Sequence, residues 1–517
     1  MRKKQYKIFA AIHLGSEMIS MQIVQYRNLN NIKILEECNR RVRLGEETFK
    51  NKIIPFSMVN EICELLVGFK RLMTEYEVEE YSMQATTAVR EALNRVFLID
   101  QIYIRTGLKV TVIDLPEEIY TKYQSIRRTM KLDGLTGVDE SMLMMDISSG
   151  GLGITFVKDN VICYQQNLNI GVIRVKESFN RNQRSSMKFN QALAEYLSST
   201  MGAVRDALKN EQVRYLVLSG AESELLLQML GIEFKAGVIR IKTEQFMQLF
   251  KTVHALNLPQ IIKVFKINED IAELVVPTIL LYEQLLALVQ VQEIILTDDR
   301  FIDGICLLHI GPKTNRDYAA ELEQEQLSLF HSIGRRYHYD EAHSRQVEKL
   351  AVAMFDKLGK HHGLDSHSRI LLQATALLHD IGKYVSLRSH SLYSYKLLMS
   401  SDILGFSELD KKIVALASYY HAHRLFSGSI HADVEEMSPE IMPLVAKIAA
   451  LVRLADAMDR SYKQKIKSCR VNVKNGVMKV DAVTREDLTI EEWTFASKAS
   501  FFEEVYGLQA VLERVER

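Results

Sequence analysis

The first 25 residues alternate between apolar and polar positions in a way that is typical of β-strands. Apolar side chains dominate residues 8–12, a polar turn follows at 14–17, and residues 18–25 alternate again. A period of two predicts a β-hairpin over residues 6–25. The same succession of strand, Gly/Ser-rich turn and strand returns about 130 residues later, at 141–157. Such a repeat predicts two related α/β lobes with a cleft between their turns.

Further along the chain, the hydrophobic period changes several times between that of a strand and that of a helix. Helices dominate from a linker near residues 311–315 to about residue 463. The Asn475-Gly476 pair, flanked by alternating apolar positions, predicts a second hairpin in the tail. The remaining predicted elements are a helix at 57–75, a strand entering a helix at 81–92, strands at 108–113, 213–220 and 293–296, a helix at 280–293, tail strands at 469–474 and 477–483, a short strand containing Trp493, and a helix at 501–515.

Composition limits the class of protein. A chain of 517 residues is too long for one core and suggests three or four domains. Lys and Arg number 65, as do Asp and Glu, so there is no broad basic field that would indicate a nucleic-acid partner. Five scattered cysteines without CxxC spacing indicate reduced thiols. Neither a signal peptide nor a membrane span is recognisable, and we expect a cytoplasmic protein without a membrane partner.

Histidine and aspartate occur in the order H…HD…D, each on its own predicted apolar helix. The members of this set are His343, His379, Asp380 and Asp456. Two imidazoles and two carboxylates suit a divalent ion such as Mn, Fe, Co, Ni or Zn. Such an ion supplies hydroxide at neutral pH and neutralises charge on a phosphoryl oxygen. A buried histidine bonded to a carboxylate is also an ordinary core feature, but the ordered set resembles the HD-domain phosphohydrolase superfamily over residues 320–462.

Several residues near this set have open roles. Lys383 and Arg424 are placed to meet substrate phosphates, although both could be solvated surface charges. His390, His421 and His423 follow where some members of the superfamily place extra ligands. They could line a second metal site, contact a substrate phosphate, or face solvent.

Motifs in the first 174 residues, taken in order, resemble the exopolyphosphatase / guanosine pentaphosphate phosphatase (Ppx/GppA) family. These motifs are Ala11-Ile12-x-Leu14-Gly15-Ser16, Arg43-Leu44-Gly45-Glu46, the run Ala85 to Ala92, Glu117-Glu118, Asp146-Ile147-x-x-Gly150 and Ile170 to Arg174. The resemblance implies two actin-like (ribonuclease H-like) lobes, polyphosphate or a phosphorylated nucleotide as substrate, and a homodimer. It also implies Glu118 (or Glu117) as the base that activates water and Asp146 as a Mg ligand. The implied phosphate-binding residues are Gly15, Ser16, Arg90, Ser149 and Gly150.

The same motifs depart from the family pattern inside the cleft. His13 stands where the family has Asp, and Glu17 and Met18 replace Asn and Ser. In the second loop, Leu152 and Gly153 replace a hydroxyl and an acidic residue. Losing one such donor or base typically costs a factor of roughly 10² or more in rate. We therefore predict a degenerate cleft between the lobes.

Three hypotheses follow. In the first, the helical HD domain is the working phosphohydrolase, with Asp380 and Lys383 in the chemistry, and the lobes bind a nucleotide or polyphosphate. In the second, the cleft is an ordinary exopolyphosphatase site and the HD domain is a scaffold. In the third, the chain is a non-catalytic regulator that binds polyphosphate or an alarmone. The expected fold is α/β plus all-α, with lobes at 1–128 and 129–312, an HD-type domain at 320–462 and a small α/β cap at 463–517.

Overall fold

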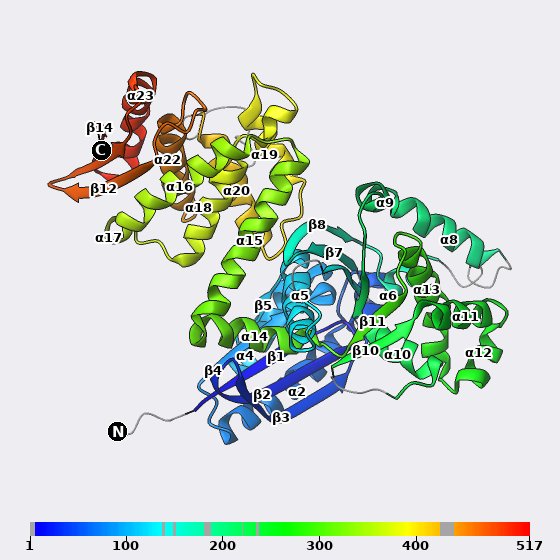
Figure 1. The fold of residues 1–517 in the computed structure, drawn as a ribbon. Helices are drawn as coiled ribbons and strands as arrows, with labels where there is room; N and C mark the ends of the chain where they lie inside the picture. Colours follow the sequence, from blue (N-terminus) through cyan, green and yellow to red (C-terminus); the bar gives the residue numbers. More distant parts are fainter. Residues whose placement is uncertain are drawn as a thin grey trace. The chain divides into compact units, whose positions relative to one another are not determined.

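A computed structural model describes residues 6–136, 140–147, 151–179, 183, 188–219, 221–233, 237–423 and 439–516. The chain divides into two compact units, residues 1–322 and 323–517. The first unit holds two α/β lobes and the second is mainly helical (Figure 1).

The first lobe is a five-stranded sheet in the order β3-β2-β1-β4-β5, in which β1 pairs antiparallel with β2 and parallel with β4. The predicted hairpin at residues 6–25 is therefore confirmed. The elements of this lobe are β1 (Lys7–Leu14), β2 (Met18–Asn28), β3 (Asn31–Arg41), α1 (Leu44–Asn51), α2 (Phe56–Glu75), β4 (Glu80–Ala85), α3 (Thr87–Glu91), α4 (Arg95–Thr106), β5 (Thr111–Val112) and α5 (Leu115–Leu132).

Strand β1 is buried on both faces, which explains why its sequence is almost continuously apolar. Ala10, Ile12 and Leu14 pack into one cluster with α2 and α4, whereas Phe9 and Ala11 pack into another. The helix that covers the second face is α14 (Phe301–Thr314), which packs on β1, β2 and α5. Residues 301–312, expected in the second lobe, therefore pack on the sheet of the first.

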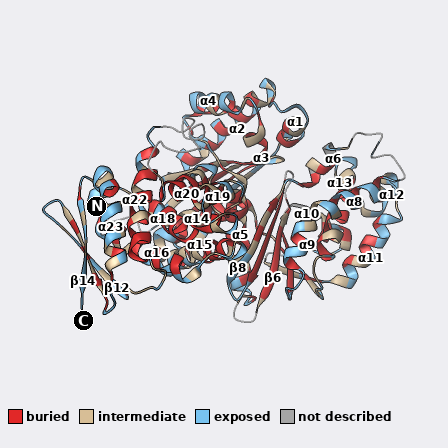
Figure 2. Cartoon of the chain, turned by 90° about the horizontal axis from the view of Figure 1, so that it is seen from above, coloured by how far each residue is buried: buried red, intermediate tan, exposed pale blue. Residues whose placement is uncertain are grey.

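The second lobe is a six-stranded sheet in the order β10-β11-β9-β6-β7-β8. Here β6 pairs antiparallel with β7 and parallel with β9, as β1 does with β2 and β4, so the predicted duplication is visible in the strand pairing. Buried residues, red in Figure 2, fill its strands and inner helix faces. The elements are β6 (Ser141–Ile147), β7 (Leu152–Lys158), β8 (Val161–Leu168), α6 (Val172–Glu177), α8 (Phe189–Thr200), α9 (Gly202–Leu208), β9 (Tyr215–Ser219), α10 (Ala221–Leu230), β10 (Val238–Lys242), α11 (Thr243–His254), α12 (Leu258–Phe265), α13 (Glu269–Leu286) and β11 (Glu293–Thr297).

The second unit packs helices α16, α18, α20 and α22 against one another, with α19 on α20 and α23 on α22. Helix α15 begins in the first unit and continues into this one. The elements are α15 (Arg316–Arg336), α16 (Glu341–Lys357), α17 (Gly359–His362), α18 (Ser366–Leu378), the 3₁₀ helix η1 (Ile381–Tyr384), α19 (His390–Met399), α20 (Glu408–Tyr420), α22 (Met442–Met458), β12 (Ser468–Lys474), β13 (Val477–Val483), α23 (Thr489–Tyr506) and β14 (Gln509–Val515).

The tail differs from the sequence-based expectation in two elements. Trp493 lies on α23 rather than on a strand, and residues 509–515 form a strand rather than the end of a helix. Helix α23 ends because Gly507 adopts a left-handed φ of 65°, a conformation that favours glycine. The residues that follow pair in parallel with β13, so the hairpin predicted around Asn475-Gly476 gains a third strand.

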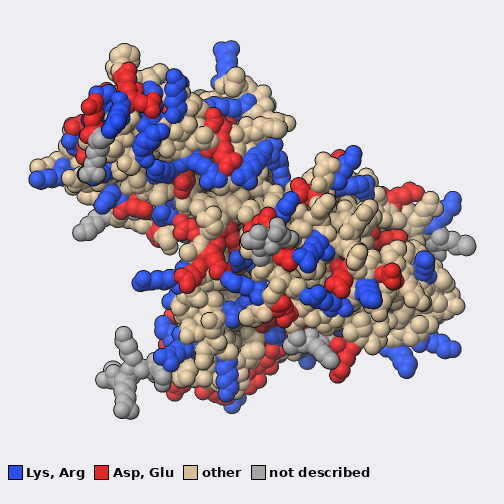
Figure 3. All heavy atoms as spheres, in the orientation of Figure 1, with Lys and Arg blue, Asp and Glu red and all other residues tan. Residues whose placement is uncertain are grey.

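Basic and acidic side chains are interspersed on the face shown in Figure 3. All five cysteines are free. Within the described residues, no helix is both long and apolar enough to cross a membrane.

The close packing of α14 on α5 gives a first prediction. A Cβ added at Gly304 would lie 2.1 Å from the backbone oxygen of Thr121, so Gly304→Ala forces the two helices apart. We expect a loss of about 1–3 kcal/mol in the free energy of unfolding, measured by urea denaturation. The matched control is Gly68→Ala on α2, where a Cβ meets nothing within 4 Å and a gain of up to about 1 kcal/mol is expected. Equal stabilities of the two variants would contradict this account.

Candidate metal centre

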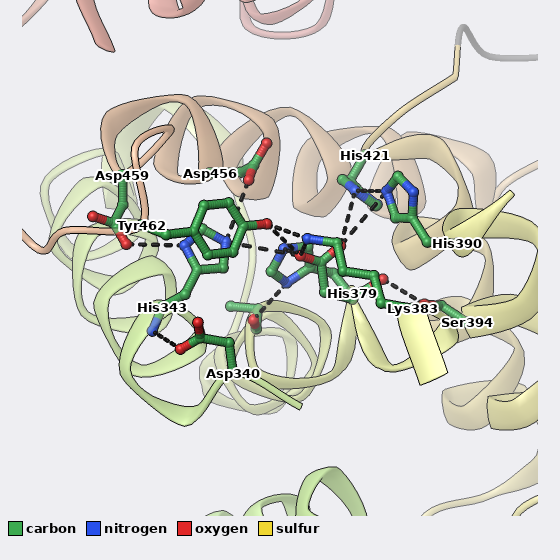
Figure 4. A network of polar contacts seen from close by, with 12 residues as sticks. Asp340, His343, His379, Lys383, His390, Ser394, His421, Asp456, Asp459 and Tyr462 are labelled. Carbon is green, nitrogen blue, oxygen red and sulfur yellow. Dashed lines mark hydrogen bonds and ion pairs between the residues drawn. The ribbon is translucent and has the colours of Figure 1, made fainter. Parts of the chain in front are cut away.

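Three helices of the second unit bring the H…HD…D residues to one buried place. His343 lies in the first turn of α16, His379 and Asp380 follow α18, and Asp456 lies in the last turn of α22 (Figure 4). These helices bury their apolar faces against one another, and that packing carries the four polar groups into the interior. Both histidines are 0% exposed, and the two carboxylates are 6% and 4% exposed.

The ligand atoms of this set are close enough to share one ion. His343 Nε2 lies 3.4 Å from Asp456 Oδ1 and 3.9 Å from Asp380 Oδ2, and His379 Nε2 lies 3.5 Å from Asp380 Oδ2. One ligand atom each from His343, His379 and Asp456 falls within 4.8 Å of the others. The Nε2 atoms of both histidines are buried and make no hydrogen bond. Buried polar atoms without partners are rare, and two that converge on carboxylates fit a cation site.

Hydrogen bonds at Nδ1 explain why these Nε2 atoms are available. His343 Nδ1 lies 2.9 Å from Asp459 Oδ2, and His379 Nδ1 lies 2.9 Å from the carbonyl oxygen of Ala376. Because a carbonyl or carboxylate oxygen only accepts, each Nδ1 carries a proton, and Nε2 is the ring nitrogen that faces the carboxylates of the centre. Metal-binding histidines usually donate their other ring nitrogen in this way.

Two further histidines repeat this arrangement. Nδ1 of His390 faces the carbonyl oxygen of Leu387 at 3.2 Å, and Nδ1 of His421 faces that of Ser418 at 2.5 Å. Their Nε2 atoms lie 3.4 Å from each other. Two lone pairs at this distance repel unless a cation or a proton lies between them.

Asp380 connects the two groups of histidines. Its Oδ2 faces His343 and His379, and its Oδ1 lies 3.6 Å from His390 Nε2 and 3.9 Å from His421 Nε2. His379, Asp380 and His421 also form a second possible ligand group. The arrangement therefore offers two neighbouring ligand groups that share His379, and Asp380 lies close to the histidines of both.

Gly382 allows α19 to approach this centre. A Cβ at this position would lie 2.0 Å from the carbonyl oxygen of His390 and 2.3 Å from the amide of Ser394. The hydroxyl of Ser394 accepts from the Gly382 amide and donates to the carbonyl oxygen of His379. A glycine two residues after the aspartate is thus required for His390 to reach Asp380.

Burial and neighbouring charged groups shift the pKa values of the residues at the centre. Burial acts to lower the pKa of His343, but Asp456, Asp459 and Asp380 outweigh it and raise that pKa to about 9. Burial also acts against ionised carboxylates, yet the neighbouring histidines and Lys383 lower the pKa of Asp380. Burial lowers the pKa of His421 to about 3. Asp380 is therefore ionised and His421 is neutral at pH 7.

Three residues at the centre were missed by the sequence argument or noted without a role. Tyr462 stacks on His343, with ring centroids 3.8 Å apart, and its hydroxyl donates to Asp380 Oδ2 at 2.8 Å. Asp459 holds His343, as described above. Lys498 on α23 places its ammonium 4.0 Å from Asp456 Oδ2. Only Asp459 carried a signal in the sequence, because it lies one helical turn after Asp456.

The remaining candidates near the centre differ in placement. The ammonium of Lys383 contacts both Asp380 Oδ2 and the hydroxyl of Tyr462. His423 stacks on Tyr419, and its Nε2 lies 3.0 Å from the hydroxyl of Ser391, so it is held by partners other than the ligand set. Arg424 lies outside the described residues.

In the first unit, the expected catalytic carboxylates are already paired with cations of the same chain. Glu118 Oε2 lies 3.2 Å from Arg90 Nη1 and accepts from the hydroxyl of Thr87. Asp146 Oδ1 lies 3.4 Å from Lys122 Nζ. Burial raises the pKa of both carboxyls, and these cations oppose that effect. Lys122, four residues after Glu118 on α5, was not identified from the sequence.

The first glycine turn of this unit is likewise occupied by protein groups. The amide of Gly15 donates to the carbonyl oxygen of Met18. A Cβ at Gly15 would lie 2.8 Å from the ring of His13, so this ring closely approaches the loop. Nε2 of His13 lies 3.2 Å from Thr86 Oγ1. Ser16 lines a groove with Glu17, and Ser149 and Gly150 lie outside the described residues.

Comparison with known proteins matches most of the chain. A model of the Ppx/GppA phosphatase family matches residues 22–307, and a model of domain III of Ppx/GppA phosphatases matches residues 328–504. A guanosine-5'-triphosphate,3'-diphosphate pyrophosphatase of Pseudoalteromonas translucida is 22% identical over 82% of this chain and 83% of its own length. One of Aliivibrio fischeri is 21% identical over 94% of this chain and 95% of its own.

Solved structures match a smaller part. An exopolyphosphatase from Cytophaga hutchinsonii has a TM-score of 0.52 at 20% identity, covering 59% of this chain and 98% of that one. A Ppx/GppA family member from Aquifex aeolicus has a TM-score of 0.50 at 19% identity, with the same coverage. At these identities the likeness shows a shared fold.

His13 gives a prediction about pH. Burial, together with the charge of Lys122, lowers the pKa of His13 from its ordinary 6.5 to about 3. Between these values the unfolded chain binds the proton and the folded chain does not, so stability falls as the pH drops from about 6.5 towards 3. At about pH 5 the loss is about 1–2 kcal/mol relative to pH 7.5.

The variant His13→Asn removes this dependence. Urea unfolding at about pH 5 and 7.5 should show a smaller drop in stability for His13→Asn than for the wild type. His361→Asn, at an exposed histidine, is the control and should keep the wild-type slope. Identical slopes for the wild type and His13→Asn would refute the assignment of a neutral imidazole.

Proposed function

The chain belongs to the Ppx/GppA phosphatase family, and from this premise we propose that it hydrolyses phosphate bonds at the buried centre of its C-terminal unit. Members of this family are phosphohydrolases that generally use divalent metals. The proposed substrates carry phosphoanhydride or phosphoester bonds, as polyphosphate and guanosine pentaphosphate do. The curated relatives named for a guanosine triphosphate-diphosphate pyrophosphatase support the nucleotide.

The observation that carries this proposal is the shared orientation of four imidazoles. His343, His379, His390 and His421 each have Nδ1 beside an oxygen acceptor, and their Nε2 atoms surround Asp380. The donor set of imidazoles and carboxylates fits Mn, Fe, Co or Ni. His343, His379, Asp380 and Asp456 would hold one ion, and His390 and His421 a second, with Asp380 between them. When bound, such ions supply hydroxide at neutral pH and neutralise charge on a phosphoryl oxygen.

The residues around the ligands have separate roles in this proposal. Lys383 lies at the rim, where its side chain is 33% exposed, and its ammonium would meet an oxygen of the substrate phosphate. Asp459 accepts from His343 Nδ1, so Nε2 is the nitrogen of this ring that would bind the ion. Burial of the centre limits water around the reacting phosphate and strengthens each charged contact there.

The pairing inside the first unit supports a degenerate cleft. Asp146, the implied Mg ligand, faces Lys122, and His13 stands in place of an aspartate. A cation already fills the electrostatic role that Mg would have at Asp146. In this proposal the lobes bind a phosphorylated ligand without hydrolysing it.

A second candidate is the ordinary cleft mechanism, in which Glu118 is the base. It is favoured by the partial burial of Glu118, since loss of water around this carboxyl raises its pKa towards the range of a general base. The two candidates place the chemistry in different units of the chain and can be separated by single substitutions.

The first test measures phosphate release from guanosine pentaphosphate and from long-chain polyphosphate in the presence of Mn²⁺. We expect Asp380→Asn to lower kcat by roughly 10² or more, because it removes the charge between the two ligand groups. Glu118→Gln should stay within a few-fold of the wild type. Asp356→Asn, at a half-exposed carboxylate paired with Arg369, is the matched control in the same unit.

The alternative outcomes are specific. Loss of activity in Glu118→Gln alone would move the chemistry to the cleft. Binding of both substrates by the wild type without phosphate release would identify the chain as a regulator.

The second test counts bound ions. After chelation and dialysis, the wild type should take up two Mn²⁺ per chain, and His421→Asn should take up one, because His421 is a ligand only of the second position. Electron paramagnetic resonance of free Mn²⁺ measures the uptake. His367→Asn is the control, since His367 is half-exposed and pairs with Asp410 away from the centre. A single ion in the wild type, unaffected by His421→Asn, would exclude the second position.

A further inference from the structure

Tyr462 contacts three residues of the centre, His343, Asp380 and Lys383, although it is not itself a candidate ligand. It lies in the turn between α22 and β12. Its ring stacks on His343 with an interplanar angle of 20°, and its hydroxyl donates to Asp380 Oδ2 at 2.8 Å (Figure 4). The same hydroxyl is contacted by the ammonium of Lys383, which also lies 4.5 Å from the centre of the ring. One side chain therefore contacts two candidate ligands and the cation at the rim.

The backbone of this turn adopts a conformation that side chains rarely take. Tyr462 has a φ of 58° and Gln464 a φ of 47°, both in the left-handed region. Non-glycine residues remain there when their surroundings hold them. Here the amide of Tyr462 donates to the carbonyl oxygen of Asp459 at 2.9 Å, and the amide of Gln464 donates to Asp459 Oδ1 at 2.7 Å. The carboxylate of Asp459 thus shapes the turn and holds His343 at the same time.

Helix α23 anchors this turn from the other side. Glu491 is 0% exposed, and its carboxylate accepts from the amide of Ser461 at 3.2 Å and from the ammonium of Lys465 at 3.0 Å. A buried carboxylate is retained when it is paired in this way. The residues on both sides of Tyr462 are therefore tied to the C-terminal helix.

We propose that Tyr462 is a positioning residue of the metal centre, which orients His343 by stacking and Asp380 by a hydrogen bond, on a turn anchored by Glu491. This inference rests on the proposed function, because the residues it orients are the proposed ligands. The chemistry needs His343 Nε2 and Asp380 Oδ2 at fixed positions, and Tyr462 limits rotation of both side chains. The C-terminal residues from 459 onward then serve the centre as well as forming the cap.

Metal binding to the full chain tests this role without relying on activity. Co²⁺ is the probe, because its visible absorption reports ligand geometry; affinity is measured by calorimetry. Tyr462→Phe keeps the stacked ring and removes the hydroxyl, whereas Tyr462→Leu removes both. We expect Tyr462→Phe to weaken Co²⁺ binding about 10-fold, and Tyr462→Leu up to about 100-fold, with a changed absorption spectrum.

Two further variants complete the design. Tyr506→Phe is the matched control: Tyr506 is also a partly buried tyrosine whose hydroxyl donates to a protein oxygen, the carbonyl of Lys447, but it touches no ligand. It should change neither affinity nor spectrum. Glu491→Gln alters the anchor without touching any ligand, and we expect it to weaken Co²⁺ binding in the same direction as Tyr462→Phe. Circular dichroism of each variant establishes that it is folded, and Tyr462→Phe decides the question if Tyr462→Leu is not.

Each outcome has one meaning. If the wild type binds Co²⁺ and Tyr462→Phe binds it with the same affinity and spectrum as Tyr506→Phe, the positioning role is refuted and the metal centre stands. If the wild type binds no Co²⁺, the metal centre and the positioning role both fail. Weakened binding with an altered spectrum in Tyr462→Phe, but not in Tyr506→Phe, supports the role.

Discussion

The buried carboxylate of Asp380 is the group around which the C-terminal unit is organised. Moving an ionised carboxylate out of water costs several kcal/mol unless it is closely paired. Both of its oxygens are surrounded by nitrogen atoms, and Tyr462 adds a hydrogen bond. The partners of this carboxylate come from the end of α18, from α19, which approaches closely at Gly382, and from the turn that follows α22. The helices pack through their apolar faces, and the carboxylate determines which polar groups must meet inside them.

The two units of the chain compensate buried charge differently. In the first unit, Glu118 and Asp146 face Arg90 and Lys122, so the chain supplies both signs of charge itself. In the second unit, the Nε2 atoms of His343 and His379 face carboxylates and make no hydrogen bond within the described residues. A carboxylate that is already paired with a protein cation has little need of a metal ion, whereas imidazole nitrogens without a hydrogen-bond partner can bind one. This contrast underlies the proposal that the chemistry takes place in the second unit.

The sequence predicted the parts of the fold that depend on local periodicity. The hairpins of both lobes and the helix at 57–75 follow from patterns of period two and 3.6. The four H…HD…D residues were named because each interrupts an apolar helix, and they lie together. The prediction of a helix over residues 501–515 was wrong, because one left-handed glycine, Gly507, ends α23 and the residues after it form a strand. Tyr462 and Lys122 carry no such local signal: stacking and an ion pair across elements depend on tertiary packing.

Helix α14 makes the first lobe discontinuous in the sequence. It covers the sheet of the first lobe, although it follows the whole second lobe in sequence. The first lobe is therefore a discontinuous domain, assembled from residues on both sides of the second lobe in the sequence. A fragment of residues 1–128 would lack α14, which would leave Phe9 and Ala11 facing water, and such a fragment should aggregate.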